Sequence, residues 1–429
     1  MGFEWYLDFI DKAYAPSDDE LIALFKMSPS IGTSMEDAAG RVASESSIGT
    51  WTTLTTMSPG MRRLMAKAYS FDSGLVKVAY PRDLFEAGNV PQLVSSVAGN
   101  IFGMKALQTL KLLDLRFPKW YIDGLRGPSK GILGVRDAFK VYDRPLLATV
   151  PKPKVGMTSE EHSTAGYEAW TGGLDLLKDD ENLSSQPFNR FEERARLSFR
   201  KRDQAEKETG ERKDYLINIT AETKEMARRA KLVRDFGGSF VMVDILTVGW
   251  SALQTIREEC EDLGLAIHAH RAFHAAFTRS PEHGMSMLMV AKLARLIGVD
   301  HIHIGTVVGK LESPLEEVKI LYSELTSENF KGNKNSLDQS WYSIRPTFPV
   351  CSGGLHPGIL KDVLNIISTN IIVQVGGGLW GHPMGGKAGA KAIRQAIDAF
   401  LKNVDVQEYA KTHKELTVAL DKWGFSKPI

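Results

Sequence analysis

A lysine followed by three acidic residues, Lys178 to Glu181, is the densest group of reactive side chains in the sequence. It ends the apolar segment GGLDLL, and on an extended strand residues 178 and 180 lie on the same face. A chain that leaves the strand there can also turn Glu181 inward. Two carboxylates, Asp180 and Glu181, with one more oxygen donor suit Mg²⁺, which prefers hard oxygen ligands and keeps positions open for substrate or water.

Lys178 is the unexpected member of this group, because an ammonium repels a metal ion. It fits if CO₂ carbamylates the neutral amine, since the carbamate is an oxygen ligand. The cations Lys152 and Lys154 would lower the pKa of Lys178 and so favour the neutral form. Judged on the four residues alone, a salt-bridged acidic turn explains the cluster about equally well.

Polar or glycine residues also end the other short apolar segments in the second half of the chain. Taken alone, Asn218 or Asp244 is better explained as the surface end of a core strand than as part of a site. Together, the ends predict one site for an anionic, metal-bound ligand. These other ends are Lys152 and Lys154, Asn218, Asp244, His268-x-His270-Arg271, His301-x-His303, Ser352-Gly353-Gly354 and Gly376-Gly377-Gly378.

Two glycine groups lie where barrels commonly bind phosphate, after the seventh and eighth apolar segments. Backbone N–H groups without side chains can approach phosphate oxygens closely there, although a GGG by itself is more commonly a turn. In the sixth loop, Lys310 follows Gly305 and Gly309. It is either a cation on a mobile lid or an exposed loop lysine.

The two His-x-His pairs favour one rival interpretation, a zinc-dependent barrel hydrolase with a carbamylated lysine. In that pattern the pair lies on the first strand and an aspartate on the last. Here the pairs lie on the fifth and sixth segments and the last segment ends in glycines, so the pattern fits less well.

These residues require elements that bring distant segments together. Between about 145 and 400, eight apolar, strand-like segments alternate with amphipathic ones, and about 250 residues is the length of a TIM barrel. We therefore expect an α/β fold, with a C-terminal TIM (β/α)8 barrel over 136–429 and an N-terminal α+β domain over 1–135. The expected strands are 145–153, 172–181, 215–221, 239–247, 263–271, 300–308, 347–354 and 370–378. The expected helices include 222–236, 250–262, 283–297 and 355–366.

The first part of the chain mixes both patterns. Ser34 is placed to cap a helix that follows it, and 89–107 returns to helical spacing. The segments 73–81 and 110–118 alternate like strands. The glycine-rich segment 124–134 lies at the expected domain boundary.

Composition excludes several classes of protein. The 429 residues carry 53 Lys and Arg against 52 Asp and Glu, so no global field attracts nucleic acid or an anionic membrane. Two cysteines, Cys260 and Cys351, cannot form a disulfide framework or a thiolate cluster. The acidic N-terminal segment is unlike a signal peptide, and no stretch of about 18 apolar residues is present. We expect a soluble cytoplasmic protein with no nucleic-acid or membrane partner.

Several long motifs resemble the large chain of ribulose-1,5-bisphosphate carboxylase/oxygenase (RuBisCO). The resemblance spans nearly the whole chain, and its long motifs are highly specific. The short length and the Val150-Pro151 pair before Lys152 are most similar to the archaeal form III type. The motifs are ESSIGTWTT (45–53), GNIFG (99–103), KPKVG (152–156), GGLDLLKDDEN (172–182), HAHRAFH (268–274), HIHIGTVVGKLE (301–312), SGGLHPG (352–358) and QVGGGLWGHPMG (374–385).

The resemblance implies carboxylation of ribulose 1,5-bisphosphate by CO₂ to two 3-phosphoglycerate, with competing oxygenation by O₂. The implied mechanism uses a Mg²⁺-bound enediolate, with carbamylated Lys178, Asp180 and Glu181 as metal ligands. In the same way it implies roles for the other site residues. Lys152 would move protons at the enediolate and to the product, Lys154 would support the carbamate, His270 would assist hydration, and Lys310 would close over the site. Glu45 and Asn100 would reach in from the N-terminal domain, Glu45 pairing with Lys310. One phosphate would be bound by Arg271, His303 and Ser352, and the other by Thr50, Trp51, Gly353, Gly376 and Gly377, with Gly354 also in the substrate-binding set.

Form III resemblance further implies a homodimer or an assembly of dimers without a small subunit, and a role in nucleotide-ribose salvage. Two alternatives stay open: a RuBisCO-like enolase or isomerase, and a non-catalytic barrel scaffold. Relatives of the first kind usually replace several catalytic residues, whereas Lys152, Lys310, Glu45 and Asn100 are present. A set of buried charges without function would be costly, which disfavours the second.

Overall fold

The computed structural model describes residues 4–308 and 314–427. Its chain divides into two compact units. One comprises residues up to 126 together with 273–297 and 327–344, and the other comprises 127–272, 298–326 and 345 onward. Each is described separately below.

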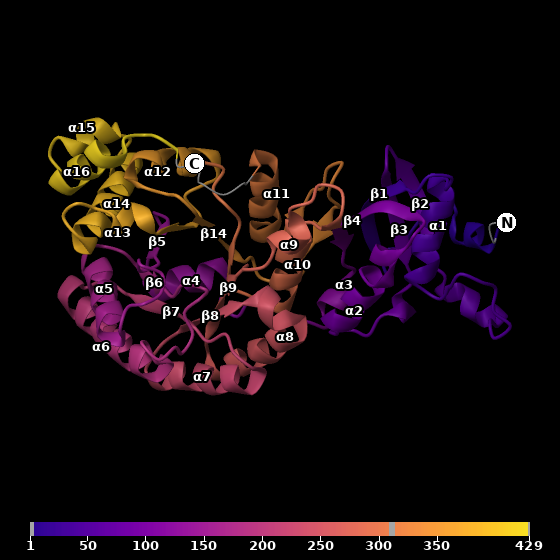
Figure 1. The fold of residues 1–429 in the computed structure, drawn as a ribbon, viewed down its shortest axis with the longest axis horizontal. Coiled ribbons are helices and arrows are strands. Elements are labelled where there is room, and N and C mark those ends of the chain that lie inside the picture. Colours follow the sequence, from indigo (N-terminus) through magenta and orange to yellow (C-terminus); the bar gives the residue numbers. More distant parts are fainter. Residues whose placement is uncertain (1–3, 309–313, 428–429) are drawn as a thin grey trace. The chain divides into compact units, whose positions relative to one another are not determined.

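Eight strands in the described part of the second unit form a closed barrel in which every neighbouring pair is parallel (Figure 1). The order around the barrel follows the order in the chain, so each crossover joins adjacent strands. The strands are β5 (Leu146–Thr149), β6 (Leu176–Lys178), β7 (Asp214–Asn218), β8 (Phe240–Asp244), β9 (Ala266–His270), β11 (His301–His303), β14 (Phe348–Ser352) and β15 (Ile372–Val375).

Period-2 alternation divides the barrel interior into an apolar and a polar layer. Near their amino ends the strands contribute apolar residues such as Leu176 and Phe240 to a buried cluster, which α4 (Gly131–Phe139) joins through Ile132, Val135 and Phe139. Two positions on from Leu176 and Met242, the same faces carry Lys178 and Asp244. The functional side chains therefore lie above a packed core, at the carboxyl end of the strands.

Helices surround the barrel strands (Figure 1). The capping chemistry is local: at the start of the first crossover helix, Thr158 accepts the N–H of Glu161 and the Glu161 carboxylate accepts the N–H of Thr158, which is a capping box. These helices are α5 (Ser159–Thr171), α6 (Phe191–Thr209), α7 (Thr223–Asp235), α8 (Ile245–Leu263), α11 (Leu315–Thr326), η5 (Pro357–Ile359), α12 (Leu360–Ile366), α13 (Gly377–Trp380) and α14 (Gly386–Leu401). Two further helices, α15 (Val406–Ala410) and α16 (Lys414–Trp423), pack on α14.

The first unit is built on a mixed sheet of order β10-β4-β1-β3-β2. Ser34 accepts the N–H of Asp37 and caps the first helix, as predicted. The strands are β1 (Leu21–Pro29), β2 (Lys67–Asp72), β3 (Leu75–Tyr80), β4 (Leu107–Arg116) and β10 (Gly284–Met285), with a hairpin of β12 (Asn329–Phe330) and β13 (Gln339–Ser340). The helices are η1 (Glu4–Phe9), α1 (Met35–Glu45), η2 (Pro59–Leu64), η3 (Arg82–Leu84), α2 (Val90–Val97), η4 (Asn100–Gly103), α3 (Lys119–Ile122), α9 (Ala275–Thr278) and α10 (Met287–Ile297).

The predicted α/β architecture with a C-terminal eightfold barrel is confirmed. Seven of the eight predicted segments contain one barrel strand each, and the remaining segment, 215–221, overlaps β7, which begins one residue earlier. Two local predictions are wrong. The helical spacing over 89–107 ends as a helix at Val97, because the chain then turns through η4 into β4. The segment 283–297 is not an amphipathic helix: every residue of α10 is buried, and Lys292 is accommodated by an ion pair with buried Asp114, 2.8 Å away.

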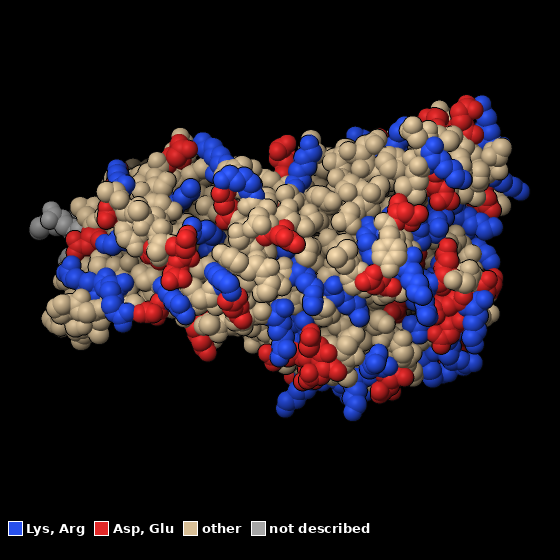
Figure 2. All heavy atoms as spheres, turned by 180° about the vertical axis from the view of Figure 1, so that it is seen from behind, with Lys and Arg blue, Asp and Glu red and all other residues tan. Residues whose placement is uncertain are grey.

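On the face that Figure 2 presents, basic side chains are interspersed with acidic ones, as the near-zero net charge predicts. No helix in the described part of the chain is both long and apolar enough to cross a membrane.

Candidate active site

Lys178, the last residue of β6, is only 1% exposed. Burial lowers the pKa of its amine, and the surrounding carboxylates Glu181, Asp244 and Asp180 oppose that shift only in part. The amine is thus biased toward the neutral form that carbamylation requires. The physical cause differs from our expectation, because the shift comes from burial rather than from Lys152 and Lys154.

Asp180 lies directly after the strand and is 4% exposed. Its Oδ2 is 2.9 Å from Nζ of Lys152, and its Oδ1 accepts hydrogen bonds from the backbone and side-chain amides of Asn182. Burial by itself would raise the pKa of Asp180, but the hydrogen bonds from Lys152 and Asn182 have the larger effect and lower it. The carboxylate is therefore held ionised. An ionised, oriented carboxylate is what a hard cation needs as a ligand.

Glu181 faces His270, the last residue of β9, with Oε2 3.6 Å from Nε2. The other ring nitrogen, Nδ1, is 3.2 Å from both the N–H of Ala272 and Oδ1 of Asp244. When Nδ1 accepts from Ala272, Oδ1 of Asp244 has no hydrogen-bond partner among the described residues. A buried carboxylate oxygen without a donor marks a position where further positive charge would be stabilising.

The donor set fits a hard divalent cation only if Lys178 takes part. Within the described residues, no three His, Cys, Asp or Glu side chains group as metal ligands do. Asp180 and Glu181 supply two carboxylates, so a third oxygen ligand must come from elsewhere. A carbamate on the neutral amine of Lys178 would provide it, and the residues present are therefore consistent with Mg²⁺.

Asp179 points away from this group, since it is out of phase with Lys178, and it is fully buried. It forms an ion pair with Arg194 of α6 at 3.2 Å, accepts the hydroxyl of Tyr215, and lies 3.1 Å from Nε2 of His162 on α5. The N–H of Asn218 also donates to it at 2.9 Å. Burial would raise the pKa of Asp179, but Arg194 and His162 lower it to about 2. This network anchors the backbone between the two candidate ligands, Lys178 and Asp180.

On β11 and β14, His303 and Ser352 are hydrogen-bonded, with Nδ1 2.8 Å from Oγ. Burial lowers the pKa of the neighbouring Arg271 to about 10, which Glu317 opposes only weakly. Gly353 and Gly354 follow with φ of 113° and 70°, a backbone that side chains rarely adopt. A half-buried guanidinium beside a hydroxyl and a glycine turn suits an anion.

The glycines after β15 approach Lys152. A Cβ built on Gly376 would lie 3.4 Å from Cε of Lys152, whereas one on Gly377 would meet nothing within 4 Å. Gly378 has a packing reason, because a Cβ there would lie 2.1 Å from the carbonyl oxygen of Leu355. Gly377 therefore leaves open space, and Gly376 lets the backbone lie close to the Lys152 side chain.

Comparison with known proteins decides the family. Residues 131–423 match the ribulose bisphosphate carboxylase large chain, catalytic domain, and residues 8–121 match the N-terminal domain of the same large chain. The chain belongs to this family.

The RuBisCO relatives are archaeal and fit the form III type. The chain is 54% identical to ribulose bisphosphate carboxylase of Pyrococcus furiosus over 100% of both chains, and 49% identical to that of Archaeoglobus fulgidus over 100% of this chain and 99% of the relative. Dimeric archaeal Rubisco from Hyperthermus butylicus has a TM-score of 0.93 at 51% identity, covering 98% of this chain and 99% of that one. Octameric Rubisco from Pyrococcus horikoshii, solved with sulfate, has a TM-score of 0.92 at 53% identity, covering 99% and 98%.

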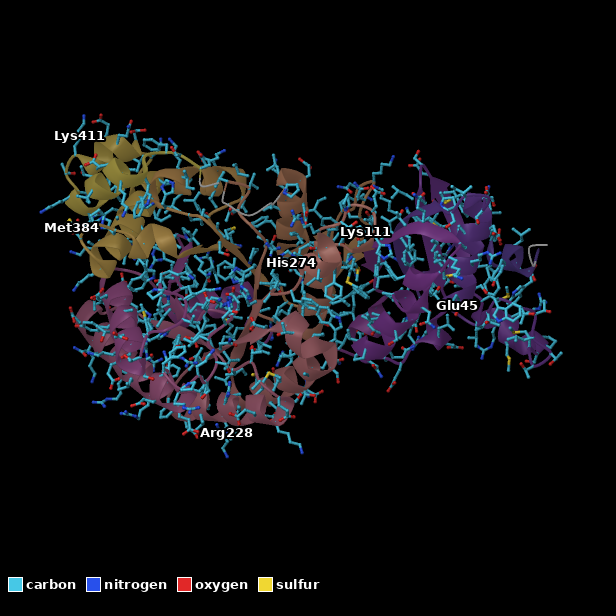
Figure 3. All side chains as sticks on the ribbon, in the orientation of Figure 1. Glu45, Lys111, Arg228, His274, Met384 and Lys411 are labelled. Carbon is cyan, nitrogen blue, oxygen red and sulfur yellow. The ribbon has the colours of Figure 1, made fainter. Side chains whose placement is uncertain are left out.

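The remaining residues of the RuBisCO motifs lie elsewhere. Lys154 is exposed two residues beyond Lys152. Glu45 ends α1 and Asn100 begins η4, both in the first unit, and Figure 3 labels Glu45. Thr50 and the exposed Trp51 lie in the same unit, where the carbonyl of Thr50 accepts the indole N–H of Trp5. Lys310 lies outside the described residues.

Some residues around the candidate site could not be identified from the sequence. His162, Arg194 and Tyr215 belong to no local motif, and each side chain meets Asp179 only in the folded barrel. The alternation of β7 offered a partial signal for Tyr215, since it places that side chain opposite to Leu216. From the sequence, Asp244 and Asn218 are included only in the whole set of strand ends, and neither residue is assigned a role of its own. In the structure Asp244 contacts His270, and Nδ2 of Asn218 donates to the carbonyls of Glu181 and Leu183.

Proposed function

We propose that the chain carboxylates ribulose 1,5-bisphosphate with CO₂ to give two molecules of 3-phosphoglycerate, with oxygenation by O₂ as a competing reaction. The observation that carries this proposal is the buried Lys178 amine, with a lowered pKa, among the carboxylates Glu181, Asp244 and Asp180 at the carboxyl end of the barrel strands. Family membership supports it independently.

The metal site we propose consists of Asp180, Glu181 and Lys178, the last as its carbamate. Bound there, Mg²⁺ would supply the positive charge that stabilises an anionic enediolate. Asp244 completes the negative side of the site and lies beside His270, whose ring nitrogens face both Asp244 and Glu181.

Lys152 is positioned to move protons at the substrate. Its Nζ is hydrogen-bonded to one candidate metal ligand, Asp180, and its stem approaches Gly376. A group held there can take or return a proton at a carbon beside the metal. We assign His270 to acid–base steps of hydration, Lys154 to support of the carbamate, and Lys310 to closure over the site.

The two phosphates of the substrate would be bound by two different groups of residues. We assign one to Arg271, His303 and Ser352, and the other to Gly353, Gly354, Gly376 and Gly377 together with Thr50 and Trp51. For the first group, the half-buried guanidinium of Arg271 would supply the positive charge. For the second group, backbone N–H groups would donate hydrogen bonds to the phosphate oxygens.

We further propose that Glu45 and Asn100 complete the site of a second copy of the chain. A homodimer would then be the minimal active unit, alone or within a larger assembly of dimers, with no small subunit. The relatives solved as dimeric and octameric Rubisco support this proposal.

The test is fixation of ¹⁴C-labelled CO₂ into 3-phosphoglycerate by the purified protein with ribulose 1,5-bisphosphate and Mg²⁺. Acid-stable label in 3-phosphoglycerate is expected. Turnover of the sugar bisphosphate without fixation would instead indicate an enolase or isomerase. Neither turnover nor CO₂-dependent Mg²⁺ binding would indicate a binding or scaffold protein.

A further inference from the structure

Three buried histidines lie inside the barrel beneath the candidate anion site. His268 on β9 and His301 on β11 are 0% exposed, and His303 is 3% exposed. Nε2 of His268 is 3.0 Å from Nε2 of His303, and Nδ1 of His303 is 2.8 Å from Oγ of Ser352. A continuous chain of hydrogen bonds therefore runs from the barrel core through His303 to the half-buried Ser352 at the rim.

Both imidazoles in this chain are neutral at ordinary pH. Burial lowers the pKa of His268 and of His303 well below the usual value. A neutral imidazole carries one N–H and one bare nitrogen. The hydrogen bond between the two Nε2 atoms contains a single proton. The ring that carries this proton therefore determines the tautomer of both rings.

Two arrangements satisfy this contact. In the first, His268 donates from Nε2, His303 accepts at Nε2, and Nδ1–H of His303 donates to Oγ of Ser352. In the second, His303 donates from Nε2 and its bare Nδ1 accepts the hydroxyl of Ser352. Each arrangement contains one Nε2–H ring and one Nδ1–H ring. The intrinsic preference of imidazole for one tautomer therefore contributes equally to both arrangements and does not decide between them.

Nδ1 of His268 decides between them, because it is buried without a hydrogen-bond partner among the described residues. In the second arrangement this atom would carry a proton, leaving an N–H in the dry core with no acceptor, which folded proteins rarely tolerate. In the first it is a bare nitrogen. The first arrangement also frees the Ser352 hydroxyl to donate outward.

We propose that His268 is a positioning residue that acts through His303 to make Ser352 a hydrogen-bond donor toward a phosphate oxygen at the rim. This rests on the proposed function only for the identity of the phosphate as part of a sugar bisphosphate. His268 touches neither substrate nor metal in this role. Its contribution is to set the direction of two hydrogen bonds in advance of binding.

Neutron diffraction from deuterium-exchanged crystals of the wild-type protein tests the proton positions directly. Deuterons are expected on Nε2 of His268 and on Nδ1 of His303. A deuteron on Nε2 of His303, or deuterons on both nitrogens of that ring, would overturn the proposal. This measurement needs no turnover, so it is independent of whether the protein is a carboxylase.

Calorimetric titration with inorganic phosphate tests the consequence. Ser352→Ala should weaken phosphate binding roughly tenfold, the usual effect of one hydrogen bond to a charged group. His268→Leu should weaken it to a similar extent, and the double variant should be no weaker than Ser352→Ala. His268→Gln, whose amide can donate from nearly the same position, should restore binding.

His301→Leu is the matched control, since it truncates the neighbouring buried histidine, whose ring nitrogens have no hydrogen-bond partner among the described residues. It should leave phosphate affinity unchanged. Wild-type affinity in His268→Leu, no effect of Ser352→Ala, or additive losses in the double variant would each contradict the proposal. A wild-type protein that binds phosphate as described but fixes no CO₂ would contradict the proposed function alone.

Discussion

Lys152 and Asp180, which are 28 residues apart in the sequence, form an ion pair with Nζ 2.9 Å from Oδ2. They follow β5 and β6, which are hydrogen-bonded neighbours in the barrel. Because Asp180 is also a candidate metal ligand, the ammonium of Lys152 and a bound cation would compete for the same carboxylate. The residue proposed to move protons would thus also oppose metal binding.

Lys152→Met should separate these two effects. Removing the ammonium leaves Asp180 free, so CO₂-dependent Mg²⁺ binding should be at least as tight as in the wild type. Carboxylation should fall by about 10²- to 10⁴-fold, the usual effect of losing a general acid–base group. Mg²⁺ affinity by calorimetry and ¹⁴CO₂ fixation measure the two quantities, and weaker Mg²⁺ binding would contradict the competition.

Lys178→Met should abolish both carboxylation and the dependence of Mg²⁺ binding on CO₂, because methionine keeps the apolar stem but cannot carry a carbamate. Lys213→Met is the matched control: Lys213 is equally buried in the same unit, and its Nζ donates to the carbonyl of Leu174 at 2.8 Å. It should lower stability by about 1–3 kcal/mol while retaining activation by CO₂. Activation that persists in Lys178→Met would show that this lysine is not the carbamylated residue.

Asp179 should make the stability of the protein depend on acid pH. Its pKa is about 2 in the folded protein, below the ordinary 3.8, so the ionised form is the one that folding stabilises. The contribution, about 2 kcal/mol, is fully present above pH 4 and is lost as the pH falls toward 2. Denaturant unfolding of wild type and Asp179→Asn should therefore differ most near neutral pH and converge in acid. A difference that grows as the pH falls would have the wrong sign.

Lys310→Ala should affect one step selectively. We propose that this lysine, once closed over the site, acts when CO₂ adds and after enolisation. Exchange of the C3 proton of ribulose 1,5-bisphosphate with solvent should therefore survive while carboxylation collapses. Tritium exchange and ¹⁴CO₂ fixation on the same preparation compare the steps. Equal loss of both would place the lysine earlier in the reaction.

Mixing two inactive variants tests the shared site. If Glu45 completes the site of a second copy, co-expressed Glu45→Ala and Lys178→Met chains form mixed dimers with one intact site and one doubly altered site. Random pairing makes half the dimers mixed, so about a quarter of all sites should be active. A mixture as inactive as its parents, with mixed dimers shown by mass spectrometry, would exclude sharing.

The control for this experiment is the pair Lys152→Met and Lys178→Met. Both residues lie in the barrel unit of the same chain, so every site of a mixed dimer carries one lesion and no activity should return. Recovery in this pair as well would indicate subunit exchange of some other kind.

Much of the site could be predicted from the sequence because its signals are local. Lys178, His270 and Ser352 end apolar segments, and alternation along a strand determines which residues share a face. The network around Asp179 could not be predicted in this way. His162 and Arg194 lie on helices whose residue pattern gives no sign of a buried carboxylate nearby. Their side chains meet at Asp179 only when α5 and α6 pack outside the barrel.

The sequence by itself determined the barrel, the order of its strands and the residues at their carboxyl ends, since turn chemistry and side-chain periodicity act over a few residues. Only the tertiary structure decided the state of those residues. Desolvation and hydrogen bonding depend on groups from other strands, which is why the lowered pKa of Lys178 has burial as its cause, Lys152 pairs with Asp180, and His268 meets His303.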